Sequence, residues 1–165
     1  MNERLAIGER PAPGFEEAFE LAKEIELEDG PAIEDGGVRD KLADWYVNGR
    51  GVTLTRFRSL TALSRGEDPG PENSIGKALT GKMRQDIAAF GMDLMDAGGV
   101  VSSADYAPMR GMFQDALLDA PSGRIAGGTD EILRNIIAER VLGLPQDIRI
   151  DKGIPFSELA KKEQR

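Results

Sequence analysis

Residues 127–145 read Gly-Gly-Thr-Asp-Glu-Ile-Leu-Arg-Asn-Ile-Ile-Ala-Glu-Arg-Val-Leu-Gly-Leu-Pro. This stretch predicts a helix with a marked start and a marked end. Gly127 and Gly128 can hold backbone angles that are closed to other residues, and they let another group approach the main chain. Thr129 is a favourable N-cap, because its hydroxyl can accept a hydrogen bond from a free amide of the first turn. The two acidic residues that follow lie where the helix dipole favours negative charge.

The rest of this stretch predicts one apolar face and a clean stop. Ile132, Ile136 and Ile137 fall at helical spacing, so we expect them to pack together on the rest of the chain. Gly143 suits the position after a helix, and Pro145 prevents the helix from continuing. By these features alone, the stretch is an ordinary capped helix.

Composition limits the chemistry of the chain. Its 165 residues are enough for one domain with a core, and its hydrophobic content of 40% is ordinary for a globular protein. The chain has no cysteine and no histidine, which excludes disulfides, thiolates and imidazole bases, so acid–base work falls to a carboxylate, lysine or tyrosine. The net charge of −8 argues against a nucleic-acid surface. Without a long apolar run or signal-peptide character, we expect a cytoplasmic protein with no membrane contact.

Two long amphipathic segments dominate the pattern. Residues 38–65 carry apolar side chains on or near one helical face, namely Val38, Leu42, Trp45, Tyr46, Val52, Phe57, Leu60 and Leu63. Gly49 and Gly51 weaken this helix, each by up to ~1 kcal/mol relative to alanine. Residues 73–97 give the clearest helical spacing, with Ile75, Leu79, Met83, Ile87, Phe90 and Leu94 three or four positions apart.

Shorter segments complete the fold prediction. Residues 15–28 and 105–118 are predicted to be helical, residues 29–37 a loop and residues 121–123 a turn. With short loops and apolar stripes to bury, these helices predict an all-α, antiparallel helical bundle.

We expect residues 1–145 to form one domain and residues 146–165 a polar tail. A di-metal bundle needs Glu-x-x-His pairs, so the absence of histidine excludes it and no metal site is predicted.

Three parts of the sequence carry a resemblance to a known family. The strongest is residues 124–145. The second is Met-Asn-Glu-Arg-Leu-Ala-Ile-Gly at residues 1–8, and the third comprises Arg39-Asp40-Lys41-Leu42-Ala43 with Gly70-Pro71-Glu72-Asn73-Ser74-Ile75-Gly76-Lys77. Together they resemble the C-terminal helical domain of bacterial acyl-CoA dehydrogenases over almost the whole chain. Members of that family have an N-terminal helical domain and a middle β-domain upstream, which they use for the flavin and the acyl-CoA pocket.

The resemblance implies α,β-dehydrogenation of an acyl-CoA thioester, in which a carboxylate removes the α-proton and hydride passes to FAD. Family members place this glutamate either immediately before the Gly-Thr of the signature or on the first helix of the domain. The first position is Gly127 here, which has no carboxylate. The second aligns with Glu3, so the resemblance implies Glu3 as the catalytic base. Without the resemblance, Glu3 would be taken as a solvated glutamate.

The resemblance also implies FAD contacts. Thr129 and Glu131 match residues that approach the flavin at a helix start. Gly98 and Gly99 match a glycine pair that approaches the flavin bound by the neighbouring subunit, although the polar residue usual just upstream is Met95 here. Residues 24–30 are acidic where many members carry an arginine that reaches the pyrophosphate, and this acidic stretch would repel such a group.

Two functions remain open. The chain resembles the C-terminal domain or a half-length subunit of a flavin-dependent acyl-CoA dehydrogenase, and it is not expected to be competent without the missing domains. The alternative is a non-catalytic helical subunit that supports a catalytic acyl-CoA dehydrogenase partner. Both imply homo- or hetero-oligomers through the helical faces, because those faces would otherwise expose apolar surface.

Overall fold

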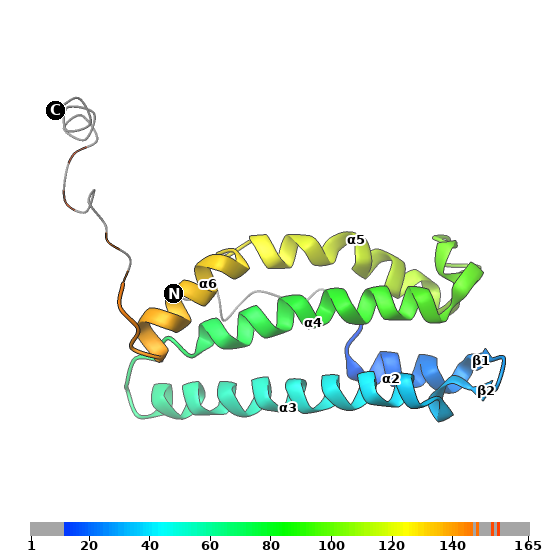
Figure 1. Ribbon diagram of the computed structural model, residues 1–165, viewed down its shortest axis with the longest axis horizontal. Coiled ribbons are helices and arrows are strands. Elements are labelled where there is room, and N and C mark those ends of the chain that lie inside the picture. Colours follow the sequence, from blue (N-terminus) through cyan, green and yellow to red (C-terminus); the bar gives the residue numbers. More distant parts are fainter. Residues whose placement is uncertain (1–11, 147, 149–152, 154, 156–165) are drawn as a thin grey trace.

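The computed structural model describes residues 12–146 together with residues 148, 153 and 155, and two long helices dominate this part of the chain. Helix α3, Gly36–Ser64, and helix α4, Asn73–Leu94, run antiparallel and pack on each other (Figure 1). Helix α3 begins at an effective cap, because the Asp35 carboxylate accepts a hydrogen bond from the Val38 amide at 2.9 Å.

Helix α4 is the central element of the bundle. Helix α5, Met112–Ile125, lies along α4 on the side away from α3 (Figure 1). Helix α6, Asp130–Ile136, follows α5 and also packs on α4, and it continues as a π-helical turn, η4, over Ile137–Val141. The turns at both ends of α5 therefore lie against the two ends of α4.

Smaller elements close the end of the bundle where α3 begins. Helix α2, Phe15–Glu24, packs on α3 and α4. Strands β1, Glu26–Leu27, and β2, Gly30–Pro31, form a short antiparallel hairpin, and the 3-10 turn η1, Ala32–Glu34, leads into α3. Two further 3-10 turns, η2 over Asp96–Val100 and η3 over Pro108–Gly111, connect α4 to α5.

The core lies in the half of the bundle that contains α2. Trp45 of α3 meets Phe90 of α4 edge-on, with ring centroids 5.0 Å apart. Phe113 of α5 is fully buried against Gly91 of α4, where an added Cβ would lie 2.1 Å from the phenyl ring. Close packing of α4 on α5 therefore requires a residue without a side chain at this point.

The other half of α3 is much less covered. Leu54, Phe57, Leu60 and Leu63 each remain roughly half-exposed, so the second half of this helix presents an apolar face to solvent. None of the described helices is long and apolar enough to cross a membrane.

The all-α antiparallel bundle predicted from the sequence is confirmed, but two local predictions are wrong. The helix predicted over residues 15–28 ends at Glu24, because the chain turns into the β1–β2 hairpin. The turn predicted at residues 121–123 is the last part of α5, which starts later than predicted and continues through Pro121. The Ser122 hydroxyl donates to the Asp119 carbonyl at 2.7 Å, and the Ala126 amide donates to the Ser122 carbonyl at 2.9 Å. The second bond shows that helical hydrogen bonding continues beyond the proline, which itself has no amide hydrogen to donate.

Candidate functional site

The turn between α5 and α6 has the predicted conformation. Gly127 and Gly128 have φ angles of 66° and 104°, which side-chain-bearing residues rarely adopt. Thr129 caps α6, as predicted, since its hydroxyl accepts a hydrogen bond from the Ile132 amide at 3.4 Å. The turn itself is partly exposed, with Gly127 on the surface and Thr129 half-buried.

A partly buried polar cluster lies beneath this turn. Lys77 of α4 is only 9% exposed, and its ammonium donates to the Gly128 carbonyl. Arg124, at the end of α5, pairs with Asp130 at the start of α6, with Nη2 and Oδ2 2.6 Å apart. The same guanidinium donates from Nη1 to the Gln85 side-chain oxygen on α4 at 2.9 Å. Side chains from three helices therefore fix the backbone on both sides of the glycines.

The ion pair also decides which face of α6 is buried. Asp130 is 6% exposed, and Leu133, one helical turn later, is fully buried with it. Ile132 is 50% exposed, so the prediction that it belongs to the buried face is wrong. The sequence carried no signal for this pairing, because Arg124 and Asp130 lie six residues apart across a turn.

Glu131 is an exposed anion at the helix start. A hydrogen bond from its own backbone amide, and secondly one from the Thr129 hydroxyl, lower the pKa of its carboxyl below the ordinary glutamate value. The carboxylate therefore already occupies part of the first turn. This end of α6 offers oxygen acceptors to N–H or O–H groups of a ligand and does not suit a phosphate.

The Gly98–Gly99 turn is built differently. Gly99 is buried within η2, and an added Cβ would lie 2.4 Å from the Met92 carbonyl oxygen. At Gly98 the added Cβ would lie 3.2 Å from the Pro108 ring. Packing within the chain is therefore enough to explain the absence of a side chain at Gly99.

Gln114 of α5 holds the second turn in place. Its side-chain amide donates to the Val101 carbonyl at 3.0 Å and to the Gly98 carbonyl at 3.3 Å. The oxygen of the same side chain is buried and has no hydrogen-bond partner in the described part of the chain. A buried acceptor in that state carries a desolvation penalty.

The structure does not bring the two glycine turns together. They lie at opposite ends of α4, a helix of 22 residues (Figure 1). At 1.5 Å per residue, about 33 Å separates these ends. Thr129 and Glu131 therefore belong to one candidate site, and Gly98 and Gly99 to another.

The proposed catalytic base cannot be placed, because Glu3 lies outside the described residues. In the described ranges, no group of His, Cys, Asp or Glu side chains could hold a metal ion.

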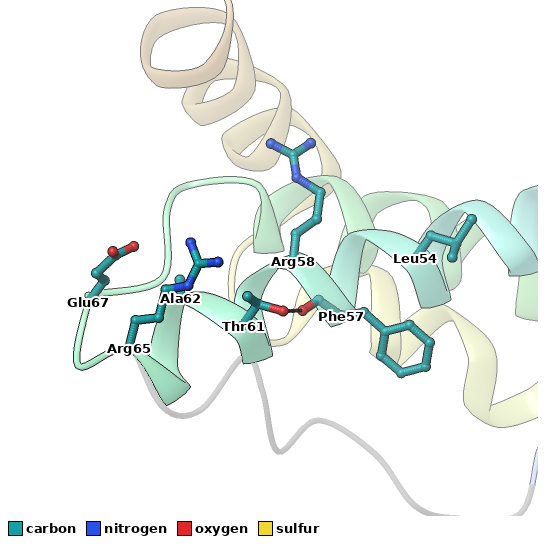
Figure 2. A pocket seen from close by; sticks show the side chains of 7 residues that line it. All are labelled: Leu54, Phe57, Arg58, Thr61, Ala62, Arg65 and Glu67. Atoms are coloured by element: carbon teal, nitrogen blue, oxygen red, sulfur yellow. Dashed lines mark hydrogen bonds between the residues drawn. The ribbon is translucent and has the colours of Figure 1, made fainter.

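A surface hollow of about 350 Å³ lies over the second half of α3 and the loop that follows it. It is lined by Leu54, Phe57, Arg58, Thr61, Ala62, Arg65 and Glu67. Figure 2 shows that the side chains of Arg58 and Phe57 point in opposite directions. The Thr61 hydroxyl donates a hydrogen bond to the Phe57 carbonyl (Figure 2). In a small-molecule site the polar side chains converge on one point, whereas these side chains do not.

Comparisons with known sequences identify related proteins. Residues 1–142 match the family model described as the acyl-CoA dehydrogenase C-terminal domain. The chain is 31% identical over 147 residues to acyl-CoA dehydrogenase FadE34 of Mycobacterium tuberculosis, a match that covers 88% of this chain and 19% of that protein. It is 30% identical over 131 residues to acyl-CoA dehydrogenase IpdE1 of Mycolicibacterium smegmatis, covering 79% of this chain and 30% of that protein. The chain thus spans about a fifth to a third of these relatives.

Solved structures share the fold. The ChsE4–ChsE5 complex from Mycobacterium tuberculosis matches with a TM-score of 0.67 and 21% identity over 80% of this chain and 35% of that chain. The Tcur3481–Tcur3483 steroid ACAD matches with a TM-score of 0.66 and 21% identity over 81% of this chain and 34% of that chain. Both matches are restricted to part of a larger chain.

Proposed function

Because this chain belongs to the acyl-CoA dehydrogenase family as its C-terminal domain, we propose that it forms the helical part of a flavin-dependent acyl-CoA dehydrogenase. The assembled enzyme takes an acyl-CoA thioester as substrate and forms a double bond between its α and β carbons. The domains that complete the flavin and acyl pockets come from a longer chain or from a partner subunit. Alone, the described helices leave apolar surface uncovered, as the half-exposed side chains of α3 indicate.

The turn from Gly127 to Thr129 carries this proposal. It combines a fixed backbone with an exposed surface, since buried side chains anchor it from below while Gly127 and Glu131 face outward. The missing side chain at Gly127 leaves room for a flat ring to approach the main chain.

FAD, when bound, accepts the hydride that leaves the β-carbon. The residues of this chain would position and orient the flavin. Thr129 and Glu131 would offer oxygen atoms to N–H and O–H groups of the flavin. The Glu131 carboxylate is ionised at neutral pH, as an ordinary glutamate is, and its pKa is lowered further. At the other glycine pair, the partly exposed Gly98 would lie next to a second flavin held by a neighbouring subunit, whereas the buried Gly99 would shape the turn.

Glu3 removes the α-proton in this proposal. A general base of this kind has to lie within hydrogen-bond reach of the proton that it takes. Gly127 occupies the alternative family position and has no group that can take a proton. The assignment of Glu3 therefore rests on the sequence resemblance.

The test is to co-express the chain with the coding region that precedes it in its genome, and to record the visible absorption of the purified assembly. We expect a flavin band that travels with the chain, and reduction of that flavin by an acyl-CoA, with straight-chain and steroid-derived thioesters assayed in parallel. Glu3→Gln should abolish the reduction while the flavin band stays, whereas the exposed control Glu16→Gln on α2 should have no effect. Absence of flavin from every assembly would contradict the proposal.

A second candidate function is a packing subunit for a catalytic partner. The observation that favours it is the half-exposed apolar face of Leu54, Phe57, Leu60 and Leu63 on α3, which suits a protein partner. In this role the base belongs to the partner, so Glu3→Gln would leave the activity of the assembly unchanged.

A further inference from the structure

Lys77 is the one lysine or arginine that is buried within residues 12–146. Lysine side chains are rarely buried to this extent unless they are paired, because removing the ammonium from water is costly. Its ammonium lies against the Gly128 carbonyl, 51 positions further along the chain. One contact of this buried ammonium is therefore with the turn before α6.

The turn needs such a restraint. Two successive glycines have more backbone freedom than any other pair, so holding them in one conformation costs conformational entropy. Arg124 restrains the far side of the turn through Asp130, within α6. Lys77 restrains the glycine itself, directly before Thr129.

We propose that Lys77 is a positioning residue for the flavin: through the Gly128 carbonyl, it fixes the turn that presents Thr129 and Glu131. This inference rests on the proposed function.

Lys82 provides a matched control on the same helix. It lies five residues after Lys77, is exposed and pairs with Asp86 on the surface. Lys82→Met removes the same charge from α4 without touching the turn.

The experiment uses the co-expressed assembly with FAD as the probe. Lys77→Met should weaken FAD binding at least tenfold, while Lys82→Met should leave it unchanged. Lys77→Arg, which keeps a donor for the Gly128 carbonyl, should recover part of the loss. Amide hydrogen exchange should accelerate at residues 127–131 in Lys77→Met and stay unchanged around Phe113, which separates a local loss of order from general unfolding.

Several outcomes are decisive. Wild-type FAD binding and wild-type hydrogen exchange at residues 127–131 in Lys77→Met would overturn the role of Lys77 while leaving the proposed function intact. A wild-type assembly without FAD would overturn the proposed function and, with it, the flavin role of Lys77. If Lys77→Met does not fold, Lys77→Gln replaces it, and unchanged FAD binding and exchange in that variant would also overturn the inference.

Discussion

The two turns at the ends of α4 both require glycine, but for different physical reasons. Each end faces a turn that contains a glycine pair, and in each turn a long polar side chain from a neighbouring helix holds a glycine carbonyl. At Gly127 and Gly128 the backbone has positive φ angles, so glycine is needed for its conformation. At Gly99 the neighbouring Met92 carbonyl leaves no room for a side chain, so glycine is needed for space. A conformational glycine leaves the surface of a turn open to a ligand, whereas a steric glycine is already covered by its own chain.

The largest loss of stability should come from adding a side chain at Gly99. In Gly99→Ala the new methyl group overlaps the Met92 carbonyl, which belongs to the backbone of α4 and cannot move aside easily. We expect a loss of about 3 kcal/mol in the free energy of unfolding, the upper end for overpacking. Urea unfolding followed by circular dichroism measures it. Gly98→Ala should cost less, because its methyl group would lie 3.2 Å from the Pro108 ring and would not overlap a backbone atom. Equal losses would contradict the steric explanation.

The next largest loss of stability should follow removal of Arg124, which holds the turn at Gly127 and Gly128. Arg124→Met leaves the buried Asp130 carboxylate without its cation. Breaking a fully buried pair costs about 3–5 kcal/mol, and the partial exposure of Arg124 reduces our expectation to about 2 kcal/mol. Thermal and urea unfolding of the purified chain measure the loss. The exposed pair Lys23–Glu20 is the control, since Lys23→Met should change stability by less than about 0.5 kcal/mol.

A smaller loss of stability should follow removal of Gln114, which holds the turn at Gly98 and Gly99. Gln114→Leu removes the side-chain donor to the Val101 carbonyl and one of two donors to the Gly98 carbonyl, which keeps the Val101 amide. It also removes the buried oxygen that has no partner in the described part of the chain. The two changes partly cancel, so we expect a loss of about 1 kcal/mol. Hydrogen exchange should accelerate around residues 98–101 and stay unchanged around residues 127–131. Acceleration at both turns would mean that the two ends of α4 are not independent.

The smallest effect is a dependence of stability on pH that arises from Glu131, next to the turn at Gly127 and Gly128. The folded-state pKa of Glu131 is lowered by its own backbone amide and by Thr129, so its carboxylate stabilises the fold above the unfolded-state pKa. That contribution is lost as the pH falls below about 5 and through the folded-state value. Glu131→Gln should flatten the acid side of a plot of unfolding free energy against pH. A plot that keeps its wild-type slope in this variant would show that other carboxylates account for the acid loss.

Local physics was sufficient for part of this protein. Helical periodicity identified α3 and α4, and the glycine–threonine start of α6 was predicted correctly, because backbone preferences and capping act within a few residues. The all-α class followed from the same patterns. The family also followed from the sequence, through a collinear stretch of residues.

Only the tertiary structure decided how the turns are held and where they lie. Lys77 meets Gly128 across 51 positions, and the Arg124–Asp130 pair turns Leu133 inward in place of Ile132. The continuation of α5 through Pro121 also overrode a strong local turn signal. The Lys77 contact joins segments far apart in the chain, and the Arg124–Asp130 pair forms across the turn between two helices. No local period in the amino-acid sequence encodes such contacts.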